Sequence, residues 1–194
     1  MQQWLSVKGK SFLRKAGARP GQTLLDFGCR AGNYTLPAAE IAGPEGKVYA
    51  LDKDPEAMDK LRQTLLEWNL DNVECLCVNE NQEIPLPENS VDMLLLYDVF
   101  HGGYFPDRAQ RLRLLQKIHR ALKPGGLLSV YPTHLKQYGL TFKKILSEAK
   151  ETGFTLQGEA RRNLIHDQRF CRGRVFTLTK KQEALGGTSY LRSA

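Results

Sequence analysis

One short stretch constrains the fold more than any other part of this chain of 194 residues. Residues 24–27 are apolar enough to form a buried parallel strand, and Gly28 and Gly32 follow in a loop that leads into a helix. Glycine permits tight turns and close approach of a ligand, and the free N–H groups at the start of a helix point back at such a loop. A second apolar run, residues 48–51, ends at Asp52. This pattern predicts a nucleoside pocket in a doubly wound sheet, in which Asp52 accepts hydrogen bonds from both ribose hydroxyls.

The same loop discriminates between nucleoside cofactors. A dinucleotide site uses a Gly-x-Gly-x-x-Gly loop that admits a pyrophosphate, whereas here Gly28 and Gly32 flank Arg30. Asp26 lies at the tip of the first strand, where a carboxylate would repel a pyrophosphate. An acid at that position favours a cofactor with an ammonium group and a positive sulfur, which describes S-adenosylmethionine. A nucleotide-linked dehydrogenase is therefore a poor interpretation.

Several segments resemble the class I S-adenosylmethionine-dependent methyltransferases, in particular the ubiquinone/menaquinone-biosynthesis group. They occur in the family's order, at residues 26–32 (with Arg30 at the middle glycine of the family's D-x-G-x-G-x-G loop), 46–52, 79–92, 97–101 and 122–127. Each motif alone is weak, but five in the right order at compatible spacings are a strong signal.

The resemblance implies an α/β fold with a Rossmann-like, doubly wound, mostly parallel seven-stranded sheet. Its strand order would be 3-2-1-4-5-7-6, with an antiparallel final strand pair. We expect a single domain over residues 1–183, an N-terminal lid or helix in residues 1–20, and a loose tail from 184 to 194. Apolar patterning predicts strands at residues 24–28, 48–51, 73–78, 93–97, 127–131, 154–160 and 175–179. It predicts helices at residues 33–42, from 55 onward, 112–122 and 142–149.

The resemblance also implies a set of site residues. Asp52 would bind the ribose, Glu80 would contact the adenine, and Asp98 would accept from the methionine ammonium or shape the pocket. His101 follows the fourth strand beside the expected methyl group, which makes it the candidate catalytic base. Alternatively, His101 packs against the cofactor or bonds to backbone. Tyr104, Tyr131 and His134 could line the acceptor site. The expected cofactor-binding residues are Asp26, Gly28, Cys29, Gly32, Tyr34, Asp52, Lys53, Glu80, Asn81 and Asp98.

Charge is distributed unevenly along the chain, whose net charge is +7. Residues 1–107 carry 10 Lys and Arg against 16 Asp and Glu, whereas residues 108–194 carry 18 against 5. The basic half suits an anionic acceptor, either nucleic acid or a metabolite with a phosphate or carboxylate. Solvated helix faces would explain the same charges. Five arginines gather around the final strands, with His166 and Phe170 between them: Arg161, Arg162, Arg169, Arg172 and Arg174.

We expect a cytoplasmic protein without membrane insertion, because no apolar run reaches the length of a bilayer span and no secretory pattern is present. The four cysteines lack a zinc-binding spacing, so no metal is predicted. The predicted function is methyl transfer from S-adenosylmethionine to a small, anionic or neutral molecule by in-line displacement, with S-adenosylhomocysteine as product. The alternatives are an RNA methyltransferase and a cofactor-binding protein without turnover.

Overall fold

A computed structural model describes residues 1–78, 83–166 and 168–181. Its seven-stranded sheet has the order β3-β2-β1-β4-β5-β7-β6, which confirms the order implied by the family resemblance. The strands are β1 (Thr23–Phe27), β2 (Lys47–Asp52), β3 (Val73–Cys77), β4 (Val91–Tyr97), β5 (Leu122–Tyr131), β6 (Phe154–His166) and β7 (Arg169–Lys180). The first five strands are mutually parallel, and β7 runs antiparallel to both β5 and β6.

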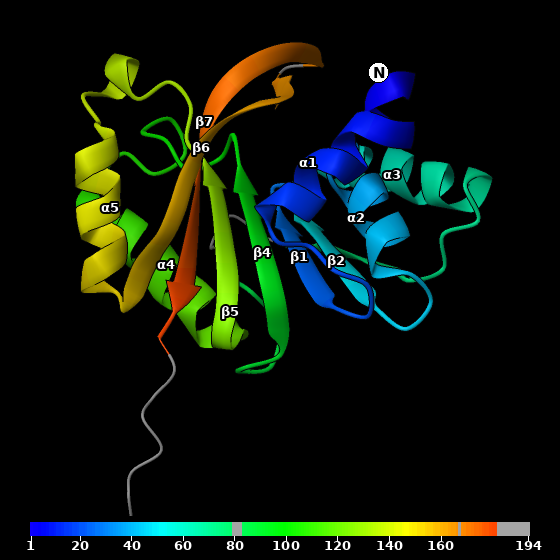
Figure 1. The fold of residues 1–194 in the computed structure, drawn as a ribbon, viewed down its shortest axis with the longest axis horizontal. Coiled ribbons are helices and arrows are strands. Elements are labelled where there is room, and N and C mark those ends of the chain that lie inside the picture. The colour runs from blue at the N-terminus through cyan, green and yellow to red at the C-terminus, as the bar shows by residue number, and fades with distance from the viewer. Residues whose placement is uncertain (79–82, 167, 182–194) are drawn as a thin grey trace, which may run out of the picture.

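Helices cover both faces of this sheet (Figure 1). They are α1 (Gly9–Ala16), α2 (Thr35–Ala42), α3 (Pro55–Glu67), α4 (Arg108–Ala121) and α5 (Phe142–Glu151), with a π-helical turn η1 (Trp4–Lys8) and a 3-10 turn η2 (Lys136–Tyr138). Helices α1, α2 and α3 lie on one side, and α4 and α5 lie on the other. Among the described residues, no helix combines the length and apolar character needed to cross a membrane.

Local sequence signals fix where these helices begin. The carboxylate of Asp54 accepts the backbone N–H groups of Glu56 and Ala57 and so caps α3, whose first residue is a proline. Asp107 and Gln110 form a reciprocal capping box at the start of α4. Each cap satisfies backbone donors that would otherwise lack partners.

The core has two halves because successive side chains of the central strands point to opposite faces. Leu25 and Leu94 pack on the side of α4 and α5. Leu24, Met93 and Leu95 pack on the side of α1 and α2. All five side chains are fully buried, as expected for a parallel sheet covered on both faces.

The final strand pair is longer than predicted. β6 and β7 continue to His166 and from Arg169, whereas apolar patterning limited them to residues 154–160 and 175–179. Strand β5 likewise begins at Leu122 rather than at residue 127. The extra backbone pairing of β6 and β7 passes through charged residues such as Arg161 and Arg162, which interrupt the apolar pattern before the buried Leu164 and Ile165. The far end of this hairpin reaches beyond the carboxyl edge of the parallel strands (Figure 1).

The N-terminal segment is an integral part of the helical layer. The buried Trp4 ring packs against Phe12 and Tyr34, and its Nε1–H donates to the carbonyl of Asn33 at 2.8 Å. No described residue of segment 1–20 lines the cavity that lies at the carboxyl ends of the parallel strands. The segment is therefore a packed helix, and its expected role as a lid stays a prediction. The expected tail at 184–194 lies outside the described residues.

Candidate functional site

A cavity of about 510 Å³ lies at the carboxyl ends of the parallel strands. Its walls come from the ends of β1, β2 and β4, from the segments after β4 and β5, and from the last residue of β6. Gly28 follows β1 and Asp98 follows β4, so the cavity lies between the two strands where the strand order reverses. This switch point is where open α/β sheets bind ligands.

Asp52 ties the second strand to the glycine loop. Its Oδ2 accepts the backbone N–H of Arg30 at 2.7 Å, and its Oδ1 accepts that of Asp54 at 3.1 Å. The side chain is nearly buried yet borders the cavity. Two N–H donors therefore orient a carboxylate whose remaining lone pairs can accept bonds from a ligand.

The loop itself has an unusual backbone. Gly28 has a φ of +79°, and a Cβ placed there would lie 2.4 Å from Cγ2 of Val99. Arg30 has a φ of +45°, which is uncommon for a residue with a side chain. Any side chain at Gly28 would therefore disturb the fold as well as the cavity. The bond from Arg30 to Asp52 helps to hold the strained conformation.

Asp26 lies beneath the loop. It is buried and accepts a hydrogen bond from Oγ1 of Thr35 at 2.6 Å. Burial raises the pKa of Asp26 to about 7, and the nearby Asp52 carboxylate adds to that rise, although the Thr35 bond opposes it. The carboxyl group therefore titrates near neutral pH.

Some of the expected cofactor-binding residues line the cavity: Gly28, Asp52, Lys53 and Asp98. The others that the structure describes, Asp26, Cys29, Gly32 and Tyr34, do not line it. Cys29 packs its sulfur 3.6 Å from that of Met58, and the buried Tyr34 hydroxyl donates to the Ile165 carbonyl at 2.7 Å. Their cofactor contacts stay predictions. Glu80 and Asn81 lie outside the described residues.

Histidine and tyrosine rings gather at the other end of the cavity. His101 and Tyr138 stack with ring centroids 5.5 Å apart and an angle of 10° between the rings. His134 lies 5.3 Å from His101 and 5.2 Å from His166, measured between ring centroids. Three of the four histidines in the chain thus meet here, together with Tyr104. Of the predicted acceptor residues, Tyr104 and His134 line this cavity and Tyr131 does not.

His101 has a defined hydrogen-bonding role. Its Nδ1 accepts the backbone N–H of Gly103 at 3.0 Å, so the neutral ring carries its proton on Nε2. Burial lowers the pKa of His101, and the neighbouring His134 lowers it further. A neutral ring with its proton on Nε2 can donate a hydrogen bond from that atom. The predicted role as a base stays a prediction, and this bond favours the alternative of a backbone-bonded histidine.

Asp98 is held from two sides. Oγ1 of Thr133 donates to its Oδ1 at 2.5 Å, and Nδ1 of His166 lies 2.5 Å from its Oδ2. Sequence analysis did not place His166 in this site, because His166 is 68 positions from Asp98 and belongs to a different strand. The one available signal was its position near a predicted strand pair at the sheet edge.

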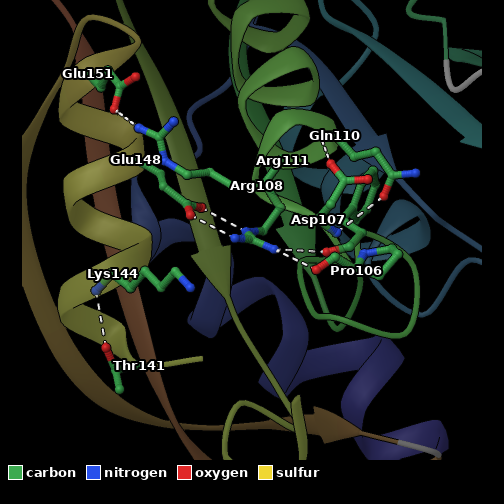
Figure 2. A network of polar contacts seen from close by, with 10 residues as sticks. Pro106, Asp107, Arg108, Gln110, Arg111, Thr141, Lys144, Glu148 and Glu151 are labelled. Carbon is green, nitrogen blue, oxygen red and sulfur yellow. Dashed lines mark hydrogen bonds and ion pairs between the residues drawn. The ribbon is translucent and has the colours of Figure 1, made fainter. Parts of the chain in front are cut away.

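A buried ion pair supports the segment that carries His101 and Tyr104. Arg111 of α4 donates through Nε and Nη2 to the two carboxylate oxygens of Glu148 in α5, both at 2.8 Å (Figure 2). Its Nη1 donates to the carbonyl of Phe105 at 3.0 Å. Both charged side chains are almost fully buried. The bidentate pair therefore fixes two helices and the loop between β4 and α4 in one geometry.

A second hollow, of about 530 Å³, lies between α1 and the β6–β7 hairpin. Five cationic side chains line it, and no acidic residue is among its described lining: Lys8, Lys15, Arg161, Arg162 and Arg172. Phe170, which is 48% exposed, borders it under the ammonium of Lys8. Arg174 instead pairs with Glu159, and Arg169 is not part of this lining. The predicted arginine cluster is thus divided.

Residues 24–126, just over half of the chain, match the family model described as a methyltransferase domain. The chain belongs to this family. It is 31% identical over 118 residues to a demethylmenaquinone methyltransferase of Geobacillus stearothermophilus, a match that covers 61% of this chain and 48% of that protein. The Listeria monocytogenes (strain HCC23) demethylmenaquinone methyltransferase is 33% identical over 124 residues, with 64% and 50% covered. The chain spans about half the length of these relatives.

Solved structures share the fold. An S-adenosylmethionine-dependent methyltransferase from Aquifex aeolicus matches with a TM-score of 0.72 and 24% identity, over 90% of this chain and 92% of that one. TrmN from Thermus thermophilus matches with a TM-score of 0.69 and 28% identity, over 89% and 48%. The [4+2]-cyclase SpnF also matches, with a TM-score of 0.69 and 16% identity, over 91% and 81%. The shared fold therefore does not by itself determine the reaction, which depends on the residues of the site.

Proposed function

We propose that this domain binds S-adenosylmethionine at the carboxyl edge of the sheet and catalyses methyl transfer to a small molecule, releasing S-adenosylhomocysteine. The observation that carries the proposal is Asp52, a carboxylate at the tip of β2 that is oriented by the N–H of Arg30 and borders a cavity at the switch point. Membership of the methyltransferase domain family also supports this proposal.

The lining of the cavity fits this cofactor chemically. Asp52 can accept the ribose hydroxyls, and Asp98 lines the same cavity, where it would shape the pocket. Leu51 and Val78 supply apolar surface next to Asp52, where a nucleobase can pack. When bound, S-adenosylmethionine supplies an electrophilic methyl carbon. The residues of the chain then bind, align and shield the reactants, and alignment alone can contribute roughly 7–11 kcal/mol in favourable cases.

The acceptor half of the cavity favours a flat molecule. The stacked His101 and Tyr138 rings, with Tyr104 and His134 beside them, form a wall of aromatic surface with polar edges. The relatives named above are demethylmenaquinone methyltransferases, whose named acceptor contains a flat ring system. We therefore infer a small ring-containing acceptor. The Nε2–H of His101 would donate a hydrogen bond to an oxygen on that ring.

An RNA acceptor is the second candidate, and the basic hollow beside α1 is the observation that favours it. Five cations and the exposed Phe170 ring could hold phosphates and stack a base. RNA binding would then weaken with salt, with a slope of about −0.7 per phosphate contact. Replacing Arg162 and Arg172 together should flatten that slope by roughly one unit. A small acceptor predicts no such binding at physiological salt.

The test is transfer of a labelled methyl group from S-adenosylmethionine to three pools: a demethylmenaquinone analogue, a metabolite extract and bulk tRNA. We expect label in one of the first two pools and none in tRNA. Label in tRNA alone would favour the RNA acceptor. S-adenosylhomocysteine binding without label in any pool would favour a cofactor-binding protein without turnover.

We also place the protein in the cytoplasm. Its four cysteines, Cys29, Cys75, Cys77 and Cys171, are all free thiols. Free thiols suit a reducing compartment.

A further inference from the structure

We propose that Asp98, His134 and His166 form a binding site for one divalent first-row transition metal ion in the acceptor half of the cavity. Each of the three residues offers one ligand atom, and these atoms all lie within 4.8 Å of one another. All three side chains line the cavity. The sequence predicted no metal because these residues follow no local spacing motif.

The convergence of the three side chains arises from the tertiary fold. Asp98 directly follows β4, His134 lies after β5, and His166 is the last residue of β6. Asp98 and His134 have φ angles of +60° and +52°. Left-handed backbone is unfavourable at a residue with a side chain, and such strain persists where the surrounding structure requires it. Two of the three proposed ligands thus share a feature that gathers at functional sites.

The donor set has the chemistry of a transition-metal site. Two imidazoles and one carboxylate suit zinc, iron, cobalt or nickel, whereas magnesium and calcium prefer oxygen ligands alone. Three protein ligands leave at least one coordination position open, as in catalytic rather than structural zinc sites. Oγ1 of Thr133 donates to Oδ1 of Asp98 at 2.5 Å, which supplies the outer hydrogen bond that usually orients a ligating carboxylate.

The geometry can accept an ion with small movements. Ligand atoms bound at roughly 2.0–2.2 Å to one ion lie about 3.0–3.5 Å from one another. Oδ2 of Asp98 and Nδ1 of His166 are 2.5 Å apart, so they would separate by about 0.5–1.0 Å. The His134 ring is exposed and can rotate to close the remaining distance. A ligating imidazole nitrogen must be free of its proton, so the neutral His166 ring would bind the ion through Nδ1 and carry its proton on Nε2.

Such an ion would define the acceptor more narrowly. This consequence rests on the proposed function, whereas ion binding itself does not. The three proposed ligands line the same cavity as His101 and Tyr138. An acceptor in that space would have an oxygen or nitrogen atom able to ligate a metal. A purely hydrocarbon ring would gain nothing from the site.

The test titrates the full chain with Co²⁺ and Zn²⁺, without cofactor. Co²⁺ is followed by its visible absorption, and Zn²⁺ by competition with a chromophoric chelator. The variants are His134→Asn, which suits the left-handed backbone, and His166→Gln. The matched control is His119→Gln, which replaces the one histidine outside the cavity. Thermal unfolding and S-adenosylhomocysteine binding are measured for every variant, so that failure of the metal site and failure of the cofactor site are distinguished.

We expect one ion per chain, with affinity lowered roughly tenfold or more in His134→Asn and His166→Gln and unchanged in His119→Gln. A Co²⁺ spectrum with intense sulfur-to-metal charge transfer would assign the ion to cysteines and overturn the proposal. Equal affinity in all variants, or no ion bound by the folded protein, would also overturn it. The second of these results would leave Asp98 and His166 as a metal-free hydrogen-bonded pair.

Discussion

Asp52 and Arg30 are joined by a hydrogen bond of 2.7 Å from the Arg30 backbone N–H to Oδ2 of Asp52. This bond links the tip of β2 to the loop after β1, so the carboxylate that we assign to the ribose also holds the glycine loop. Arg30 adopts a left-handed backbone conformation at the position where the family has glycine. Arg30 thus departs from the motif in residue type, and its backbone adopts a conformation that glycine reaches without strain.

Arg30 variants should separate backbone conformation from side-chain chemistry. Arg30→Gly keeps the N–H and relieves strain of roughly 1–2 kcal/mol, while the added freedom of the unfolded chain costs about 0.5–1 kcal/mol. We expect urea unfolding to show a free energy equal to wild type or higher by up to about 1.5 kcal/mol. Arg30→Val, which is β-branched, should be less stable than wild type by about 1–2 kcal/mol. The reverse order would contradict this account of the loop.

Asp26 should make stability depend on pH. Its pKa is about 7 in the folded protein and 3.8 in the unfolded chain, so the folded state binds the extra proton between these values. The stabilisation that comes from this proton is complete below about pH 4. It is lost as the pH rises through 7. Asp26→Asn removes this titration. Its advantage over wild type should therefore grow by about 2–3 kcal/mol from pH 5 to pH 8, measured by urea unfolding. A difference independent of pH would refute the assignment.

The Tyr34 hydroxyl should act on stability rather than on cofactor affinity. Its hydroxyl donates to the Ile165 carbonyl at 2.7 Å and accepts the Ile165 N–H at 3.2 Å, both in the interior. Tyr34→Phe should lower the free energy of unfolding by about 1–3 kcal/mol, because these buried groups lose a partner. Calorimetry should show unchanged S-adenosylhomocysteine affinity. Lost affinity with unchanged stability would return Tyr34 to the cofactor site.

The two ion pairs between α4 and α5 offer a matched comparison (Figure 2). Arg111 and Glu148 are buried, whereas Arg108 and Glu151 are about half exposed. Glu148→Gln leaves a buried guanidinium without its counter-charge and should cost about 3–5 kcal/mol in urea unfolding. Glu151→Gln should cost at most about 1 kcal/mol. Equal effects of the two variants would show that burial does not govern these pairs.

The sequence was sufficient for the parts of the fold that rest on apolar runs and caps. Residues 93–97 and the Asp54-Pro55 start of α3 are examples, and the strand order followed from the family resemblance. The paired ends of β6 and β7 were missed because their backbones pair through charged residues such as Arg162. Backbone pairing of this kind leaves no trace in hydrophobic periodicity.

The site residues were harder to predict than the strands, because strand position alone does not always fix where a side chain points. Asp52 could be placed because a strand tip fixes where its side chain lies. Asp26 lies at the end of β1, two residues before Gly28 and in the same sequence motif. Its side chain is nevertheless buried against Thr35. Which way a side chain points, and which distant residue meets it, are properties of packing. For the same reason no local pattern could bring His166 to Asp98.

The central claim is that Asp52 holds a nucleoside cofactor, and calorimetric titration with S-adenosylhomocysteine tests it most directly. Asp52→Asn should weaken binding by about 2–3 kcal/mol, or roughly 30- to 150-fold in Kd, because charge-assisted bonds to the ribose are lost. The matched control is Asp92→Asn, since Asp92 also accepts a backbone N–H, from Thr23 at 2.8 Å, but lies outside the cavity. We predict wild-type affinity in that control. Wild-type affinity in a folded Asp52→Asn protein would contradict the account.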